Sequence, residues 1–230
     1  MADWIYLESS RLVDLYAFSV ALDVATEKKR IVRTTAVSSF LVNHPNVEVI
    51  GFPSKEDSVI QLNIAKDTSF PETIYAIVSA IGGKNPVFST DLHFHCPIIH
   101  KGVCERVLRD RSALIYLLDN RTNPIDLMFI DETCRLLFEK GIQIASIGEF
   151  TVPCIRGTMD LRSLLSMPEI VSLIENVPFI ICNNKDLAQY CSIRDKYVFF
   201  IEQTVNGIKC NGADVSIPGQ LVNMILKTTQ

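Results

Sequence analysis

The chain has 230 residues, of which 48% are hydrophobic and 21% charged, and this composition excludes a disordered or fibrous protein. Its length allows one large α/β domain or two small ones. The formal net charge of −4 provides no overall positive field that would favour nucleic acid or an anionic membrane as a partner, although a local basic groove is compatible with it.

The seven cysteines are scattered without a CxxC pair, and several stand in apolar strand or helix patterns, where a thiol behaves as a small hydrophobic group. This usage fits a reducing compartment. The N-terminal residues do not begin a signal peptide, and no run of about 18 apolar residues occurs along the chain. We therefore expect a cytoplasmic protein that does not span a membrane.

Segments of strand and helix periodicity alternate along the first half of the chain. They predict strands and helices in the order 4–7 (strand), 12–28 (helix), 30–35 (strand), 36–43 (helix), 47–52 (strand), 59–65 (strand) and 71–81 (helix). The mixed-charge stretch 101–111 is predicted to be an interdomain linker.

A second series of alternating elements follows this linker. It predicts strands at 113–118, 142–147, 153–156, 179–182 and 197–201, and helices at 125–140, 161–176 (broken around Pro168) and 218–227. Strands that alternate with helices in both halves predict an α/β protein with two parallel sheets, each covered on both faces.

The most informative stretch is 179–190, where an apolar strand leads through Asn183 and Asn184 directly into a helical pattern. The first turn of a helix has backbone N–H groups without intrahelical partners and a partial positive charge, which together stabilise a bound phosphate. Asn184 is suited to cap this helix, and Lys185 adds a cation. The pattern indicates an anion-binding corner between strand and helix.

Three polar loops, 119–123, 148–149 and 183–186, follow predicted parallel strands and should converge on one crevice at the carboxyl edge of the sheet. Arg121 and Lys185 would supply cations for a diphosphate there. Polar turns after strands are common, so each loop alone indicates little. The chain has no GxGxxG, GxxxxGK[ST] or GxSxG motif, which argues against dinucleotide oxidoreductases, P-loop enzymes and α/β-hydrolases.

Asp14 is predicted to lie in the first turn of the helix that follows the loop beginning at Ser9. Two interpretations fit this position. The carboxylate either complements the helix dipole, which is worth about 0.3–1 kcal/mol, or acts as a general base that faces the interdomain cleft.

Metal-ligand residue types cluster only at His93, His95, Cys96 and His100. Alternation in a strand would point His93 and His95 to the same face, which suits a shared ion. No second cluster completes the ligand set, and solvated histidines on an alternating strand explain the pattern equally well.

The order of these elements and loops resembles the heptosyltransferase-like glycosyltransferases of the ADP-heptose type. The segment 9–22 is similar to the family's opening Ser-Ser-x-Gly-Asp loop and helix, with one extra residue and without the glycine. The segments 138–148 and 157–165 are similar to the family's surroundings of the nucleotide, and 179–190 resembles its Asn-Asp-Ser/Thr-Gly-x-x-His diphosphate motif. In this motif Asp186 replaces the glycine and would repel a phosphate unless turned away, while Lys185 compensates.

The resemblance implies a GT-B-like fold, in which two Rossmann-like domains with parallel sheets face each other across a cleft. It implies an N-terminal acceptor-binding domain (1–105), a C-terminal nucleotide-sugar-binding domain (106–217) and a closing helix (218–230) that packs back on the N-terminal domain. The implied activity transfers a sugar from a nucleotide-diphosphate sugar, as co-substrate and without a cofactor or metal, to an acceptor hydroxyl.

In this interpretation Asp14 is the general base, and Ser9, Ser10 and Arg11 contact the acceptor. The nucleotide sugar would be held by a larger set from the second domain: Asn120, Arg121, Thr122, Glu149, Met159, Asn183, Asn184, Lys185 and Gln189.

The acceptor is either a saccharide or the hydroxymethylated base of phage DNA, in which case the compartment is the host cytoplasm. A continuous positive groove would favour DNA; its candidates are Arg11, Lys28, Lys29, Arg30 and Arg33. Two alternatives to the enzyme remain: a catalytically inactive GT-B-like binding module, and a metal-dependent hydrolase that uses His93 and His95.

Overall fold

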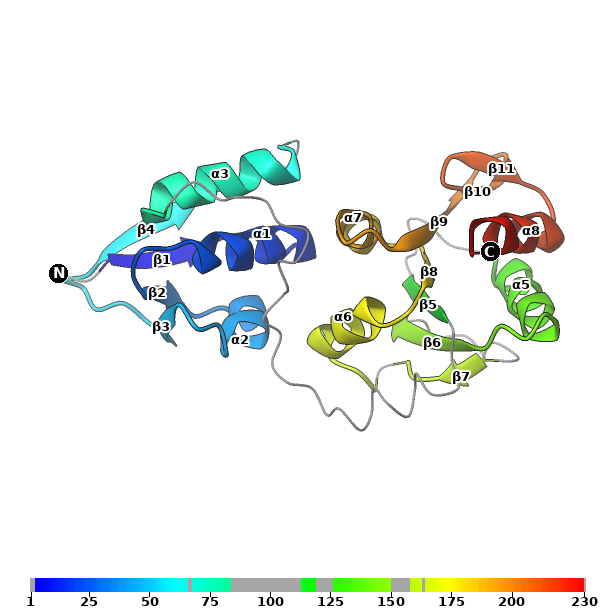
Figure 1. Ribbon diagram of the computed structural model, residues 1–230, viewed down its shortest axis with the longest axis horizontal. Helices are drawn as coiled ribbons and strands as arrows, with labels where there is room; N and C mark the ends of the chain where they lie inside the picture. Colours follow the sequence, from blue (N-terminus) through cyan, green and yellow to red (C-terminus); the bar gives the residue numbers. More distant parts are fainter. Residues whose placement is uncertain are drawn as a thin grey trace. The chain divides into compact units, whose positions relative to one another are not determined.

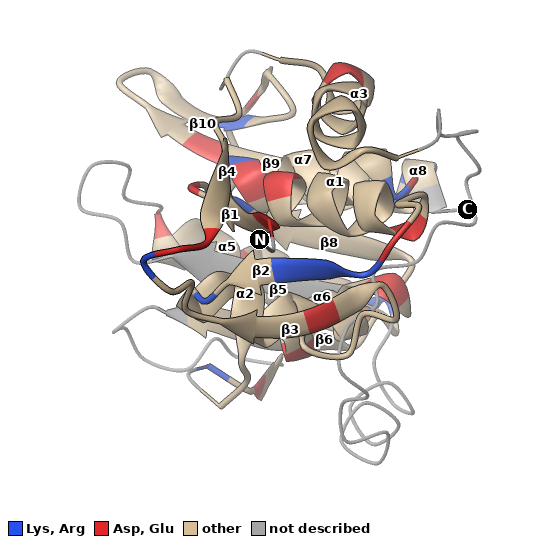
Figure 2. Cartoon of the chain, turned by 90° about the vertical axis from the view of Figure 1, so that its left-hand side faces the viewer, with Lys and Arg blue, Asp and Glu red and all other residues tan. Residues whose placement is uncertain are grey.

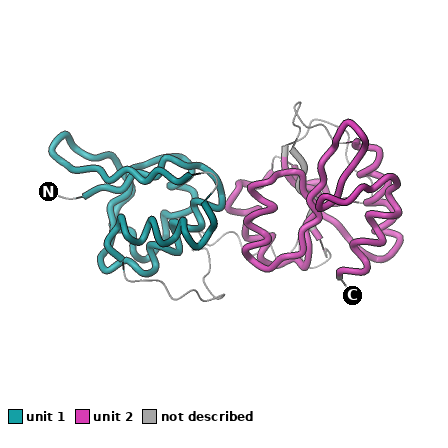
Figure 3. The backbone as a smooth tube through the Cα atoms, turned by 90° about the horizontal axis from the view of Figure 1, so that it is seen from above, with its two compact units in different colours: residues 1–98 teal, residues 99–230 magenta. Residues whose placement is uncertain are grey.

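The computed structural model describes residues 3–65, 68–83, 113–118, 126–149, 158–162 and 164–229. The chain divides into two compact units, Met1–Ile98 and Ile99–Gln230 (Figures 1 and 3). Both units combine helices with parallel strands, which confirms the predicted α/β fold class. The predicted linker and domain boundary near residue 105 lie outside the described residues.

Unit 1 contains a parallel four-stranded sheet in the order β3-β2-β1-β4. Its strands are β1 (Asp3–Leu7), β2 (Lys29–Val32), β3 (Val47–Gly51) and β4 (Ser58–Leu62), each at a position that the sequence predicts. Because these strands are parallel, the loop that follows Leu7 lies at the carboxyl edge of the sheet. This edge carries the polar residues of the segment 8–14.

The helix α1 (Leu12–Asp23) is the centre of unit 1, and its residues from Leu12 to Leu22 are all buried. It contacts both α2 (Thr35–Leu41) and α3 (Phe70–Ile81). A helix that is apolar around its whole circumference must be covered on every side, which explains this central position. The helix ends at Asp23, earlier than the predicted residue 28.

The helix α3 begins and ends as the sequence predicts. Ser69 and Glu72 form a capping box at its start, and Gly82 ends it in the left-handed conformation with φ = +68°. Its first residue, Phe70, stacks on Tyr16 of α1 with ring centroids 5.3 Å apart. This contact fixes the start of α3 against the first half of α1.

Unit 2 contains a seven-stranded sheet in the order β11-β10-β9-β8-β5-β6-β7. The strands are β5 (Ala113–Leu118), β6 (Ile144–Glu149), β7 (Thr158–Asp160), β8 (Phe179–Cys182), β9 (Tyr197–Thr204), β10 (Gly207–Cys210) and β11 (Ala213–Val215). The pairs from β9 to β7 are parallel, whereas β9, β10 and β11 form antiparallel hairpins that the sequence analysis did not predict. The strand predicted at 153–156 falls outside the described residues.

Within the described residues, the helices that cover this sheet are α5 (Leu127–Glu139), α6 (Met167–Glu175), α7 (Lys185–Ile193) and α8 (Pro218–Thr229). In Figure 1, α6 and α7 lie on one face of the sheet and α5 and α8 on the other. The closing helix α8 packs against α5 of its own unit. Leu221, Val222 and Ile225 of α8 are buried in the core of unit 2.

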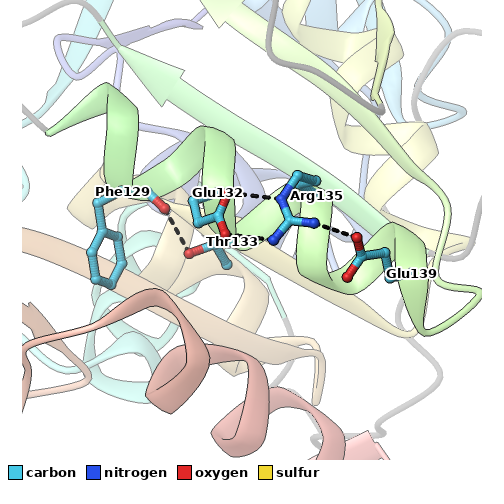
Figure 4. Close-up of polar contacts among 5 residues, drawn as sticks. All are labelled: Phe129, Glu132, Thr133, Arg135 and Glu139. Atoms are coloured by element: carbon cyan, nitrogen blue, oxygen red, sulfur yellow. Dashed lines mark hydrogen bonds and ion pairs between the residues drawn. The ribbon is translucent and has the colours of Figure 1, made fainter.

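The outer face of α5 carries charged side chains that pair along the helix (Figure 4). The Arg135 guanidinium donates to both carboxylate oxygens of Glu132, at 2.8 and 2.6 Å, and also pairs with Glu139. On the inner side, Thr133 Oγ1 donates to the Phe129 carbonyl at 2.8 Å. Exposed pairs at these spacings add little stability, so α5 is held mainly by its apolar contacts with the core.

Candidate functional site

Parallel pairing brings the ends of β5, β6 and β8 to one edge of the second sheet. Leu118 pairs with Glu149, and Tyr116 pairs with Cys182, the last residue of β8. Glu149 therefore lies two strands from the corner that follows Cys182, at roughly 10 Å by strand spacing. The predicted site residues Asn120, Arg121 and Thr122 lie outside the described residues.

The corner between β8 and α7 has the local structure that its sequence predicts. The Asn184 side chain accepts a hydrogen bond from the Leu187 N–H at 2.9 Å and caps α7. Because the cap uses the N–H of the third helical residue, the first turn is held in helical form with its dipole pointing toward the sheet edge. This is a local geometry that favours an anion.

The charges around this corner are mixed. Lys185 is 79% exposed, and its Nζ lies 3.8 Å from a carboxylate oxygen of Glu202 on β9. An ion pair this long and exposed holds the lysine weakly, so Lys185 has freedom to turn toward a ligand. Asp186 stands in the first turn of α7 and adds a negative charge to the site. Gln189 is exposed one turn farther along the helix, and Asn183 is half-buried.

Met159 lies in the middle of the strand β7. It pairs with Ala145 of β6, and its carbonyl accepts a hydrogen bond from Ser146 Oγ at 3.4 Å. The strand β7 is three positions from β8 in the sheet order, so Met159 is roughly 14 Å from the corner by strand spacing. That separation suits opposite ends of one nucleotide and excludes a shared contact with the phosphate.

In unit 1 the residues Ser9, Arg11 and Asp14 form one network. The Arg11 guanidinium binds the Asp14 carboxylate at two points, with Nε 2.7 Å from Oδ2 and Nη2 2.8 Å from Oδ1. Ser9 Oγ also donates to Asp14 Oδ2 and accepts from the Arg11 N–H at 3.1 Å. Asp14 is only 1% exposed. The carboxylate is therefore buried, oriented and charge-paired, while Ser10 stands exposed on the same loop.

From the sequence, Arg11 is expected to contact the acceptor, and its pairing with Asp14 is not predicted. The spacing of three residues between Arg11 and Asp14 at the start of a helix was the signal from which this pair could have been predicted, because side chains at this spacing lie on the same face.

The basic residues considered for a DNA groove do not gather on one edge. Lys29 and Arg30 begin β2 at the amino edge of the sheet, whereas Arg11 follows β1 at the opposite, carboxyl edge. Arg30 is paired with Glu48 of β3, with Nη2 2.9 Å and Nε 3.3 Å from its two carboxylate oxygens, so positive and negative strand segments lie side by side (Figure 2). Across the described part of unit 1, these positions do not form a continuous positive groove.

Metal ligands and reactive thiols are absent from the described ranges. No group of three or more His, Cys, Asp or Glu side chains within them could hold an ion. The predicted candidates, His93, His95, Cys96 and His100, lie outside these residues. Burial raises the pKa of the Cys182 thiol to about 12, so this side chain next to the corner is neutral at physiological pH. None of the helices that can be described is long and apolar enough to cross a bilayer.

No protein-family model matches the chain, and no curated protein matches it. Solved structures do. The chain is similar to the E. coli ADP-heptose lipopolysaccharide heptosyltransferase II (9% identity, TM-score 0.62), with 100% of this chain and 98% of the other covered. It is also similar to the E. coli heptosyltransferase WaaC with ADP-2-deoxy-2-fluoro heptose (10% identity, TM-score 0.61), with 98% and 99% covered.

A third similar structure comes from a different class of enzyme. It is the putative UDP-N-acetylglucosamine 2-epimerase of Listeria monocytogenes, with 9% identity, a TM-score of 0.53, and coverage of 98% of this chain and 87% of the other. Likenesses at such low identity show the fold alone. The chain therefore shares the two-part Rossmann-like α/β fold of heptosyltransferases and related GT-B proteins.

Proposed function

We propose that the protein is a glycosyltransferase that moves a sugar from a nucleotide-diphosphate sugar to an acceptor hydroxyl. The observation that carries this proposal is the capped strand-to-helix corner of Asn184 and Lys185, which stands at the carboxyl edge of a parallel sheet. Ligands of open α/β sheets bind at this edge. The similar WaaC structure contains an ADP sugar, which supports the same class of donor here.

In the proposed donor site, the first turn of α7 and Lys185 stabilise the charge that develops on the leaving diphosphate. Asn183, Asn184 and Gln189 border this position, and Glu149 and Met159 lie along the same sheet at distances that suit the nucleoside. The sequence segment Asn120, Arg121 and Thr122, which follows β5, completes the proposed site.

Asp14 is the proposed general base. A base must come within hydrogen-bond distance of the hydroxyl that it deprotonates. Among the described residues, Oδ2 accepts hydrogen bonds from Ser9 and Arg11, whereas Oδ1 accepts one from Arg11. Oδ1 therefore keeps a lone pair for the acceptor hydroxyl, which would approach past the exposed Ser10.

We propose a saccharide as the acceptor, with hydroxymethylated DNA as the alternative. A duplex would need several unpaired cations along one face to bind its phosphates. Arg11 and Arg30 are each engaged at two points by a carboxylate, and they lie at opposite edges of the sheet. Uncharged hydroxyl donors and acceptors such as Ser9 and Ser10 suit a sugar better.

The test is a panel of nucleotide-diphosphate sugars, with ADP- and UDP-linked members, for which binding is measured by calorimetry and transfer by mass spectrometry of acceptor saccharides. One donor should bind and be consumed. Asp14→Asn should lower transfer by at least about 100-fold, because it removes the base, and should leave donor affinity unchanged. Equal loss of binding and transfer would contradict the role of Asp14, and binding of none of the donors would contradict the function.

A catalytically inactive binding module is the second candidate, and Asp186 favours it. A carboxylate in the first turn of α7 offsets the positive end of the helix dipole, where a glycine would leave room for phosphate. This candidate predicts donor binding without transfer or hydrolysis of any donor. In that case Asp186→Gly should strengthen donor binding and still produce no transfer.

A further inference from the structure

We infer that Arg11 is a positioning residue that holds the Asp14 carboxylate in one orientation, and not a residue that binds the acceptor. The catalytic consequence of this inference rests on the proposed function. The pairing itself does not, because it is argued from the geometry of unit 1 alone.

The first step is the geometry of the pair. Nε and Nη2 of Arg11 lie 2.7 and 2.8 Å from the two different oxygens of Asp14. A planar guanidinium that contacts both oxygens brings the carboxylate plane into line with its own, which fixes rotation about the last side-chain bond of the aspartate. Ser9 Oγ adds a third donor on Oδ2.

The second step is the burial of the two partners. The Asp14 side chain is 2% exposed, whereas the Arg11 side chain is 32% exposed. Burying a carboxylate so far from water is costly unless a partner compensates it, and the arginine provides that partner while part of its own side chain remains solvated. The pair is therefore asymmetric. Loss of Arg11 would leave a buried carboxylate without its partner, whereas loss of Asp14 would leave an arginine that is still partly solvated.

The third step is the surroundings of the pair. Within the described residues, Arg11 is the only charged side chain in an ion pair with Asp14. On α3, which packs against α1, the acidic residue of the first turn is Glu72, and it is engaged by Ser69 through Oγ at 2.6 Å and N at 3.0 Å. Asp23, at the far end of α1, lies beside His44 at 3.3 Å. None of these neighbouring side chains supplies Asp14 with a second cation in place of Arg11.

The experiment begins with a double-mutant cycle on the folding equilibrium of the full chain, using Arg11→Gln, Asp14→Asn and the double variant. The cycle isolates the pair from the other contacts of Arg11. We expect the two changes to be coupled: the effect of the double variant on the unfolding equilibrium constant should differ from the product of the two single effects by at least roughly tenfold. The exposed two-point pair Arg30–Glu48 of the same unit is the matched control. The coupling measured by its cycle should be less than about fivefold in the unfolding equilibrium constant.

A kinetic readout then separates positioning from acceptor binding. Arg11→Gln should lower kcat at saturating substrates by about 10- to 100-fold and leave the acceptor KM unchanged, since a loosely held base is misplaced in every turnover. Arg11→Lys keeps the charge but not the two-point geometry, so it should restore the coupling and kcat only in part. Arg11→Lys also serves if Arg11→Gln fails to fold.

The outcomes distinguish this inference from the proposed function. Coupling no larger than that of Arg30–Glu48, or a raised acceptor KM with unchanged kcat, overturns the role of Arg11 and leaves the glycosyltransferase proposal standing. Strong coupling in a protein that transfers no sugar supports the positioning of Asp14 by Arg11, and it is the proposed function that fails.

Discussion

Glu175 shows how one carboxylate joins the two helices α6 and α7. It accepts hydrogen bonds from Tyr190 Oη at 2.7 Å and from Arg194 Nη2 at 3.0 Å, so the end of α6 is tied to the end of α7. Burial raises its pKa, but the hydrogen bonds from Arg194 and Tyr190 outweigh burial, and the pKa is lowered in the folded protein. The charged form of Glu175 therefore stabilises unit 2.

This lowered pKa gives the stabilisation a definite dependence on pH. It should be fully present above the ordinary pKa of a free glutamate, about 4.3, and be lost as the pH falls through the lower value of the folded state. Glu175→Gln should reduce the free energy of unfolding by about 1–3 kcal/mol at pH 7. The difference from the wild type should shrink as the pH is lowered from about 5 to about 3.

Urea unfolding at a series of pH values measures this difference. Glu139→Gln, on the exposed face of α5, is the control and should change stability by less than about 0.5 kcal/mol at pH 7. A Glu175→Gln effect of the same size at pH 7 and pH 3 would show that its charge does not stabilise the fold.

Residues differ in how far the sequence determines their roles. The cap at Asn184 could be predicted, because asparagine just before a helical pattern nearly always bonds to the first turn. The pairing of Arg11 with Asp14 was not predicted, because it depends on the path of the loop from Ser9 as well as on residue type. The strand β7, which has Met159 at its centre, was not predicted because its three residues are too few to show periodicity.

At the scale of elements, Asn211 closes an open strand edge in the second sheet. The strand β10 ends at Cys210, so it does not pair with the first half of β9. The Asn211 side chain takes over this pairing, since Oδ1 accepts from the Phe200 N–H at 2.8 Å and Nδ2 donates to the Val198 carbonyl at 2.7 Å. An amide side chain thus replaces a backbone segment at this edge.

Two substitutions separate the side chain of Asn211 from its backbone, which is left-handed with φ = +50°. Asn211→Gly loses both side-chain hydrogen bonds but tolerates this φ, so we expect a loss of about 1–2 kcal/mol of stability. Asn211→Ala should lose about 1 kcal/mol more, because alanine is strained at this φ. Chemical unfolding of both variants checks the order, and equal or negligible losses would contradict the bridging role.

The sequence predicted the elements that have a strong local pattern better than those that depend on tertiary pairing. The four strands of unit 1 and the helix α3 carry strong periodicity and capping signals, so their positions followed from pattern alone. The strand β10 has four residues and begins at Gly207, and β11 has three residues and begins after Gly212; β10 depends on pairing with β9, and β11 on pairing with β10. Tertiary pairing of that kind leaves almost no local signal.

At the scale of the whole molecule, a shared fold does not require shared sequence motifs. Heptosyltransferase structures superpose over nearly the full chain at 9–10% identity, because an α/β sheet requires apolar periodicity and not particular side chains. The order of strands and helices could therefore be inferred from periodicity. The chemistry could not be inferred in the same way, since Asp186 stands where the resembling motif has glycine.

The central claim is that the β8–α7 corner binds the diphosphate of a nucleotide sugar. Its most direct test is a titration of the ¹⁵N-labelled protein with the donor, in which the backbone amide signals of residues 183–187 are followed by NMR. These signals should shift, and those of β10 should not. Lys185→Ala should weaken donor binding about tenfold. Lys209→Ala, which removes a lysine with a similar 3.8 Å ion pair, should leave donor binding unchanged. Saturable binding that leaves the corner amides unmoved, or an unchanged affinity in Lys185→Ala, would contradict the account.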